Sequence, residues 1–247
     1  MWHQVGVRIY VVERDVYARQ AISSYLSWDR RTKVIGTAGS VHEMITAIAA
    51  DPEDPRLNTV IVDAGLATST ADLGGLIRTI RHHMETVSVI CLASKPDAVL
   101  AITARQAGAR AFLTREQVGM GIAGAVRFAL LRAFVVTEDV ANLLTKQDQG
   151  NGITVLPPRR HYPRLTPRIE QALWLCVLEG LPAELAAEEM SVSTSTVRSY
   201  IKEGYRILEA DDETSYPSII SPAERAFLRF TALNEPGEMP TPWRPAA

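Results

Sequence analysis

The sequence has few cysteines, no surplus of positive charge and no long apolar run. Its two cysteines, Cys91 and Cys176, both stand within apolar runs, which is typical of buried thiols rather than of a disulfide or a metal site. No stretch approaches the roughly 18 apolar residues that a membrane span needs, and the first residues lack the basic and apolar regions of a secretion signal. We therefore expect a cytoplasmic protein with no membrane partner.

The charge balance restricts the ways in which the chain can bind other molecules. It has 26 Lys and Arg against 28 Asp and Glu, a formal net charge of −2. This balance excludes a protein that holds nucleic acid by bulk positive charge, although a local basic face could still do so. With 247 residues and 47% hydrophobic content, the chain can bury two small cores, so we expect two domains.

The first half alternates short β-branched runs with helical stretches, from Val7 to about Leu131. Five such repeats predict an α/β domain over 1–136 with a five-stranded parallel sheet that helices cover on both faces. The runs at 60–62 and 89–92 are continuously apolar, as strands buried on both sides require. In such a sheet the working crevice lies beyond the carboxyl ends of the strands, where we expect the functional residues.

The second half has a different pattern. Turn-forming residues and two adjacent prolines predict a linker over 137–164, and proline-rich residues 235–247 predict a disordered tail. Between them, residues 165–234 predict an all-helical domain. Two helices with a tight connection, the second rich in small polar residues and separated cations, are the layout of a helix-turn-helix, with one more helix after it.

Start signals support these helices. Thr166 followed by Pro167 is typical of a helix cap and first helical position, and Ser193 or Thr194 can cap the longer second helix of the motif. The pair Ser221 and Pro222 marks the start of the last amphipathic helix in the same way.

Together these motifs resemble a NarL/FixJ-type two-component response regulator, in which a receiver domain precedes a LuxR-type helix-turn-helix. The resemblance implies a flavodoxin-like (CheY-like) fold for 1–136 and an all-α LuxR-type fold for 165–234. Tyr200, where histidine is common in the family, and Gly204, within the last helix of the motif, depart from the pattern. The positions that match the family's spaced pattern are Leu165, Thr166, Pro167, Arg168, Leu173, Glu179, Gly180, Leu185, Ala186, Ser193, Thr196 and Val197.

The first half resembles a receiver in layout and departs from it in chemistry. The resemblance puts the acidic pair that would bind magnesium at Glu13 and Arg14, the phosphoacceptor at Asp63, the hydroxyl position at Ala93 and the lysine position at Arg115. Magnesium requires oxygen ligands and pairs poorly with a neighbouring cation, so the arginine opposes metal binding. We expect Arg14 to pair with Asp63 while Arg115 approaches from the other side, in a pseudo-receiver that needs no metal or other cofactor.

Three alternatives remain open at this crevice. Asp63 could cap the following helix while Arg14 points to solvent as a surface charge. Asp15 could take the place of the missing acid and restore a metal site with Glu13 and Asp63. The domain could also be a conventional phosphorylation-dependent receiver, with Asp63 as its phosphoacceptor.

The resemblance also implies a face that binds double-stranded promoter DNA. Residues 159–209 hold equal numbers of cations and carboxylates, so we expect affinity to depend on their segregation and on a homodimer. We expect no enzymatic activity, and a small-molecule or protein partner could act at the receiver. The alternative is an adaptor that binds protein rather than DNA. The residues that the resemblance assigns to DNA are Arg198, Ser199 and Lys202 in the groove, Thr196 and Tyr200 at phosphates, and Arg206 on the same helix.

Overall fold

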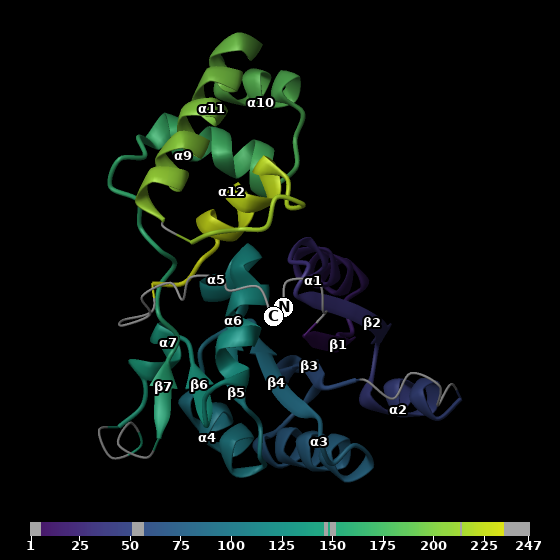
Figure 1. The fold of residues 1–247 in the computed structure, drawn as a ribbon. Coiled ribbons are helices and arrows are strands. Elements are labelled where there is room, and N and C mark those ends of the chain that lie inside the picture. The colour runs from purple at the N-terminus through teal and green to yellow at the C-terminus, as the bar shows by residue number, and fades with distance from the viewer. Residues whose placement is uncertain (1–5, 51–56, 146–147, 149–151, 213, 235–247) are drawn as a thin grey trace, which may run out of the picture. The chain divides into compact units, whose positions relative to one another are not determined.

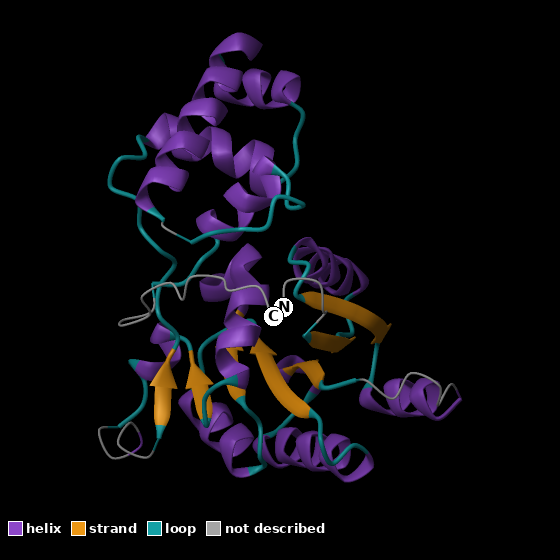
Figure 2. Cartoon of the chain, in the orientation of Figure 1, coloured by secondary structure: helices purple, strands orange, loops and turns teal. Residues whose placement is uncertain are grey.

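The computed structural model describes residues 6–50, 57–145, 148, 152–212 and 214–234. The chain forms two compact units, Met1–Pro157 and Pro158–Ala247. The first unit combines strands with helices, and the second is almost entirely helical (Figure 2). None of the helices within the described ranges is both long and apolar enough to cross a membrane. The predicted tail, 235–247, lies outside the described residues.

A single sheet with the strand order β2-β1-β3-β4-β5-β6-β7 forms the centre of the first unit (Figure 1). Every strand runs parallel to its neighbours, so the carboxyl ends of all of them meet at the same edge. The order turns back at β1, which lies between β2 and β3, and this switch point is where an open sheet forms its crevice. The strands are β1 (Val7–Val12), β2 (Thr32–Ala38), β3 (Thr59–Asp63), β4 (Ser88–Ala93), β5 (Ala111–Thr114), β6 (Phe134–Val136) and β7 (Ile153–Val155).

Helices cover both faces of this sheet. Helices α1 and α6 contact each other on one face, and α2, α3 and α4 contact one another in sequence on the other (Figure 1). Short turns η1 (Ala64–Leu66) and η2 (Gly119–Gly121) complete the connections. The helices are α1 (Val16–Trp28), α2 (Val41–Ala50), α3 (Thr70–His83), α4 (Ala98–Gln106), α5 (Arg115–Val118), α6 (Ile122–Leu130) and α7 (Glu138–Ala141).

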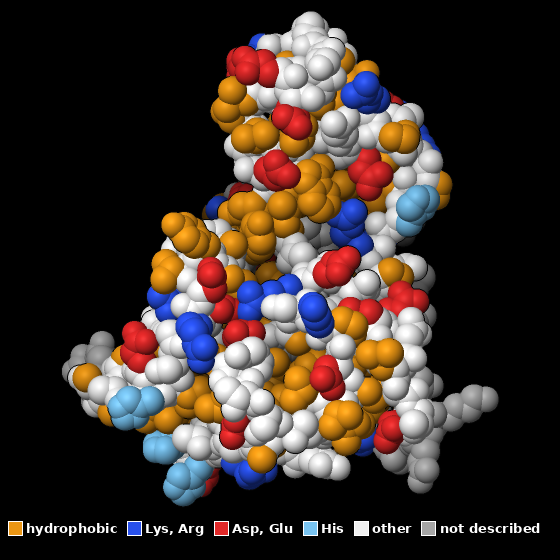
Figure 3. Space-filling model, turned by 180° about the vertical axis from the view of Figure 1, so that it is seen from behind, with side chains coloured by type: hydrophobic (Ala, Val, Ile, Leu, Met, Phe, Trp, Pro, Cys, Tyr) orange, Lys and Arg blue, Asp and Glu red, His pale blue; other side chains and the backbone are white. Residues whose placement is uncertain are grey.

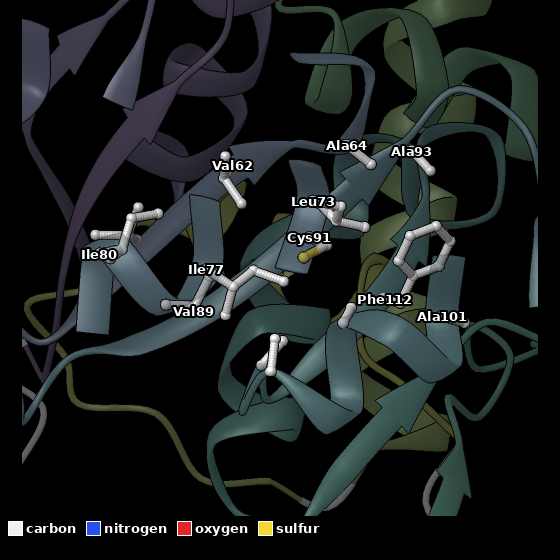
Figure 4. Close-up of a cluster of buried hydrophobic side chains, with 14 of the residues drawn as sticks. Val62, Ala64, Leu73, Ile77, Ile80, Val89, Cys91, Ala93, Ala101 and Phe112 are labelled. Atoms are coloured by element: carbon white, nitrogen blue, oxygen red, sulfur yellow. The ribbon is translucent and has the colours of Figure 1, made fainter. Parts of the chain in front are cut away.

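The core of this unit forms where the central strands meet their helices. Every residue of β1 is buried, and in β3 and β4 only one terminal residue of each is partly exposed, as the continuously apolar runs predicted. Figure 4 shows Val62, Cys91 and Phe112 from three adjacent strands packed with Leu73 and Ile77 of α3. Complete burial raises the pKa of the Cys91 thiol to about 12, so this thiol is an unreactive part of the core.

The parallel sheet with helices on both faces is confirmed, but the prediction of five strands is wrong. Strand β6 pairs with β5, and β7 pairs with β6, so the sheet has seven strands. The two additional strands and α7 lie between 134 and 155, where the sequence predicts the end of the domain and a linker over 137–164. Strands of three residues are too short to show a period, and the turn-forming residues around β7 resemble a linker.

The second unit is a small helical domain. Helix α9 continues into a π-helical turn, η3, and residues 191–193 connect α10 to α11, with Ser191 in the left-handed conformation at φ 53°. Thr166 and Ser193 accept hydrogen bonds from the first turns of α9 and α11, and Ser221 forms a capping box at α12. The elements are α9 (Pro167–Leu173), η3 (Trp174–Leu178), α10 (Ala183–Met190), α11 (Thr194–Asp211) and α12 (Pro222–Phe230).

Helix α11 packs very closely against α9 at Gly204. A Cβ atom at this position would lie 2.9 Å from side-chain atoms of Leu173, closer than real Cβ contacts. The glycine, a departure from the family pattern, is therefore required by packing: it lowers the helix propensity by about 1 kcal/mol and permits the close contact. About two turns earlier in α11, Val197 joins Ala172 and Ala186 in the small core of the unit.

Helix α12 and the residues after it contact the first residues of the second unit through hydrogen bonds. Arg159 forms a β-bridge with Leu233, and the Tyr162 hydroxyl donates a hydrogen bond of 2.8 Å to the carbonyl oxygen of Arg229. Burial raises the pKa of Tyr162 to about 12. The Arg229 side chain, 7% exposed, lies 3.5 Å from a carboxylate oxygen of Asp212. The residues before α9 are thus part of the folded unit, whereas the sequence places them in a linker.

Candidate functional site

The carboxyl ends of four neighbouring strands bring the predicted crevice residues together. Glu13 directly follows β1, Asp63 and Ala93 are the last residues of β3 and β4, and Arg115 directly follows β5. Parallel pairing places these ends side by side, as the strand pattern predicted. The ends of the apolar runs in the sequence thus predicted which residues lie together at this edge of the sheet.

Arg115 joins the two carboxylates of the crevice. Its Nη2 atom forms an ion pair of 2.8 Å with Asp63 Oδ1 and a second ion pair with Glu13 Oε2. The Glu13 side chain is 3% exposed, that of Asp63 12% and that of Arg115 26%, so the group is largely shielded from water. The other Glu13 oxygen accepts a hydrogen bond of 2.8 Å from the backbone of Asp15. One cation thus balances much of the charge of two nearly buried acids.

Arg14 and Asp15 do not point into this arrangement. Arg14 is exposed and forms no ion pair within the described part of the chain, so the expected contact between Arg14 and Asp63 is absent there. Asp15 caps α1 by accepting a hydrogen bond of 2.8 Å from the backbone of Ala18. The reason is local: a helix starts directly after Asp15, and its cap position fixes the directions of the neighbouring side chains.

The crevice residues do not fit a magnesium ion. A metal site here would need free oxygen ligands from Glu13 and Asp63, and both carboxylates already pair with Arg115. Asp63 also accepts a hydrogen bond of 3.1 Å from the backbone of Gly65, as the cap of η1. Among the described residues, no group of three His, Cys, Asp or Glu side chains is arranged to hold a metal.

A second polar group lies at the same edge of the sheet: Thr114, at a strand end that the sequence indicated, bonds to Thr137 and Asp139, which the sequence did not indicate. The buried Thr114 hydroxyl donates a hydrogen bond of 2.6 Å to Asp139 of α7, and the Thr114 backbone donates one of 3.2 Å to the hydroxyl of Thr137. These bonds link β5, the strand before Arg115, to the end of β6. The rule that strand ends carry polar residues would have found Thr137 if β6 had been recognised.

The predicted DNA-contacting residues lie on α11, with different degrees of exposure. Arg198, Ser199, Lys202 and Arg206 are exposed. Tyr200 is half-buried and packs against the core of the unit, which limits what its ring can reach. The half-buried Thr196 has its hydroxyl 2.7 Å from that of the capping residue Ser193. Only the first four are therefore fully open to a partner.

Most of the cations on α11 have acidic neighbours, so the expected segregation of charge is incomplete. Arg198 forms an ion pair of 2.8 Å with Glu184 of α10, and Arg206 forms one of 2.5 Å with Glu203. Lys202 has no such partner among the described residues. On the face of the second unit seen in Figure 3, cationic and acidic side chains are likewise interspersed. These ion pairs are exposed and can exchange for other charges at little free-energy cost.

Two sequence comparisons show where this chain is similar to known proteins. A family model described as region 4 of sigma-70 matches residues 163–208, which include α9, α10 and most of α11. A curated relative, the protein-glutamate methylesterase/protein-glutamine glutaminase of Geobacillus kaustophilus, is 26% identical over 166 residues. That match covers 67% of this chain and 44% of the relative, so this chain spans less than half of the relative's length.

The solved structures similar to this chain include response regulators. RcsB of Salmonella enterica serovar Typhimurium, bound to the promoter P1flhDC, is 17% identical with a TM-score of 0.48; the match covers 92% of this chain and 100% of that one. A LuxR-family regulator of Aurantimonas sp. is 16% identical with a TM-score of 0.46, over 55% of this chain and 92% of that one. The chain itself consists of an α/β unit with a parallel sheet, followed by a small helical unit in which a short connection joins α10 to α11.

Proposed function

We propose that this protein is a sequence-specific DNA-binding transcription regulator whose receiver-like unit is not switched by aspartyl phosphorylation. The observation that carries the proposal is the pairing of Arg115 with both Glu13 and Asp63. In this pseudo-receiver, regulation would come from a dimer, a ligand or a protein partner.

The crevice supports the loss of phosphorylation through its charges. Phosphoryl transfer depends on positioning and on neutralisation of the transferring oxygens, to which a metal ion contributes much. Here a guanidinium group holds the carboxylates that a metal would need, and Ala93 has no hydroxyl to bind a phosphoryl group. Asp63 is therefore a poor phosphoacceptor.

The helix-turn-helix supports DNA binding. Helix α11 presents Arg198, Ser199 and Lys202 close to its N-terminal end, which is the end that enters the major groove in this motif. Arginine and lysine are the side chains that most often recognise guanine there, and serine bonds to several bases. The match of residues 163–208 to sigma-70 region 4 agrees with this assignment.

Intact-mass measurement tests the receiver part of the proposal. The wild-type chain is incubated with acetyl phosphate and Mg²⁺ beside an Asp63→Asn variant, and we expect no phosphoryl adduct on either. An adduct on the wild type that disappears in Asp63→Asn would instead establish the conventional phosphorylation-dependent regulator.

Selection from a pool of random duplexes tests the DNA-binding part. Once a preferred sequence is known, Arg198→Ala combined with Lys202→Ala should weaken its binding by about 100-fold, since each base contact contributes roughly 1–3 kcal/mol. The charge-matched control, Lys33→Ala with Arg78→Ala, removes two exposed cations from the first unit and should change little. If no sequence is enriched, or if both double variants behave alike, the adaptor reading gains support.

The oligomeric state is the remaining part of the proposal. The second unit has balanced charge, so one copy gives modest attraction for phosphates and two linked copies give more. Light scattering with and without the selected duplex should find a dimer on DNA, and a monomer bound with full affinity would contradict this expectation.

A further inference from the structure

A cavity opens at the end of the sheet opposite to Asp63. It has a volume of about 360 Å³ and lies at the N-terminal ends of β4, β5 and β6, beside the last turns of α3 and α4. Figure 1 shows these two helices side by side along that end of the strands. The cavity belongs entirely to the first unit and has no part in the crevice or in the helix-turn-helix.

The cavity is rich in arginine. Arg81 of α3, Arg105 of α4 and Arg110 before β5 line it together with a single acid, Glu85. Within the described residues, neither Arg81 nor Arg110 forms an ion pair. Each guanidinium group is instead held by one backbone carbonyl: Arg81 Nη1 donates to Gly108 at 3.4 Å, and Arg110 Nη1 donates to Arg132 at 3.1 Å. The remaining N–H groups of both side chains are available to a ligand.

The turn that follows α4 leaves room for Arg81 in this place. Gly108 has a φ of +94°, and a Cβ atom there would lie 1.7 Å from Arg81 Nη1. Only glycine therefore allows the guanidinium group to lie against this turn. Cations in the last turns of α3 and α4 also compensate the helix dipoles, but Arg110 lies four residues beyond the end of α4 and outside its last turn, so this explanation does not extend to it.

We propose that this cavity binds a small phosphate-bearing anion of about the size of a diphosphate. Guanidinium groups form forked, charge-assisted hydrogen bonds with phosphate oxygens, and the excess of cations over the one acid selects a multiply charged ligand. The volume lies at the low end of the range of small-molecule pockets, roughly 300–1,000 Å³, which suits a small anion. Arg81 and Arg110 hold the anion, Arg105 adds positive charge, and Glu85 limits the affinity.

Calorimetry on the full chain with inorganic pyrophosphate tests this site independently of DNA binding. Arg81→Ala and Arg110→Ala should each raise the Kd by about tenfold, the loss expected for a charge-assisted hydrogen bond. Arg78→Ala removes an exposed cation from the same helix outside the cavity and should leave the Kd unchanged. Added salt should weaken binding to the wild type.

A gain of affinity separates this proposal from damage to the fold. Glu85→Gln removes the one acid of the cavity, so pyrophosphate should bind severalfold more tightly, which no unfolded variant can do. The proposal is overturned if the wild type shows no binding, if Arg78→Ala weakens it as much as Arg81→Ala does, or if Glu85→Gln has no effect. Citrate that binds as well as pyrophosphate would overturn the assignment to phosphate.

Discussion

Ion pairs are used differently in the two units. In the first, Glu13 and Asp63 are 3% and 12% exposed and share the guanidinium group of Arg115. In the second, Arg198 and Glu184 are 68% and 59% exposed and pair across two helices. Removing one partner of a buried pair leaves an uncompensated charge, whereas water replaces the partner of an exposed one. The ion pairs of Arg115 therefore fill the crevice at Asp63, whereas the ion pair with Glu184 leaves Arg198 able to exchange its partner for another anion.

The largest expected effect is at the closed crevice. Arg115→Ala leaves Glu13 and Asp63 without a counter-charge, so the free energy of unfolding should fall by about 2 kcal/mol. This is less than the loss for a fully buried pair, because Arg115 is partly exposed. The variant should also gain a response to Mg²⁺, since the two acids become free to bind it, and millimolar MgCl₂ should raise its Tm but not that of the wild type.

The matched control at this crevice is Arg14→Ala. Arg14 is exposed and unpaired within the described residues, so its removal should change neither the Tm nor the response to Mg²⁺. If Arg14→Ala rather than Arg115→Ala creates the response to Mg²⁺, then Arg14 is the residue that replaces the metal in solution, as the sequence suggested.

A third nearly buried acid in the first unit, Asp29, should make the stability of this unit depend on pH. Asp29 is 2% exposed; burial opposes its ionisation, but hydrogen bonds and charge from Arg31, with Arg127 at 4.0 Å, outweigh this and hold its pKa below 3.8. A lowered folded-state pKa stabilises the fold at pH values above the unfolded pKa, and this stabilisation is lost as pH falls through the folded value. Asp29→Asn should thus cost about 2 kcal/mol at pH 7.

Urea denaturation at a series of acidic pH values checks the predicted direction in which the stabilisation by Asp29 changes with pH. The difference between wild type and Asp29→Asn should stay constant at neutral pH and shrink as the pH falls below 3.8. Glu116→Gln, a change at an exposed acid, should show almost no difference at any pH. A difference for Asp29→Asn that persists unchanged to pH 2 would mean that its charge does not stabilise the fold.

Substituting a helical glycine by alanine should have opposite, smaller effects on stability in the two units. Gly204→Ala adds a Cβ atom 2.9 Å from Leu173, and the overpacking should exceed the roughly 1 kcal/mol gain in helix propensity, for a net loss of about 1 kcal/mol. Gly75→Ala, within α3, meets nothing within 4 Å and should instead stabilise by up to about 1 kcal/mol. Thermal unfolding followed by circular dichroism measures both changes, and equal signs would contradict the packing argument.

Elements that depend on interactions between residues close in the sequence could be predicted, and elements that depend on distant residues could not. The helices of the second unit have local start signals at Thr166, Ser193 and Ser221, and all three caps are present. Strands β6 and β7 have only three residues each and no period of their own. Their place in the sheet depends on pairing with distant strands, which the sequence does not reveal.

The candidate site shows the same division. The ends of the apolar runs were enough to find Glu13, Asp63, Ala93 and Arg115, because parallel strands bring those ends together. The sequence predicted both Arg14 and Arg115 near Asp63. Only Arg115 pairs with it among the described residues, because side-chain direction after β1 depends on the helix cap at Asp15. The pairing of Arg198 with Glu184 links two helices and is likewise invisible in either helix pattern alone.

The smallest expected effect is at that exposed pair and concerns DNA. Glu184 competes with phosphates for Arg198 and repels the DNA backbone, so Glu184→Gln should tighten binding to the selected duplex by severalfold, within the 0–1 kcal/mol of an exposed pair. Glu188→Gln removes another exposed acid from the same helix, and its gain should be smaller because, among the described residues, Arg198 pairs with Glu184 and not with Glu188. When Arg198→Ala is already present, Glu184→Gln should have only the effect of Glu188→Gln. Fluorescence anisotropy of the four variants measures this coupling, and equal gains in both backgrounds would show that Glu184 acts only through its charge.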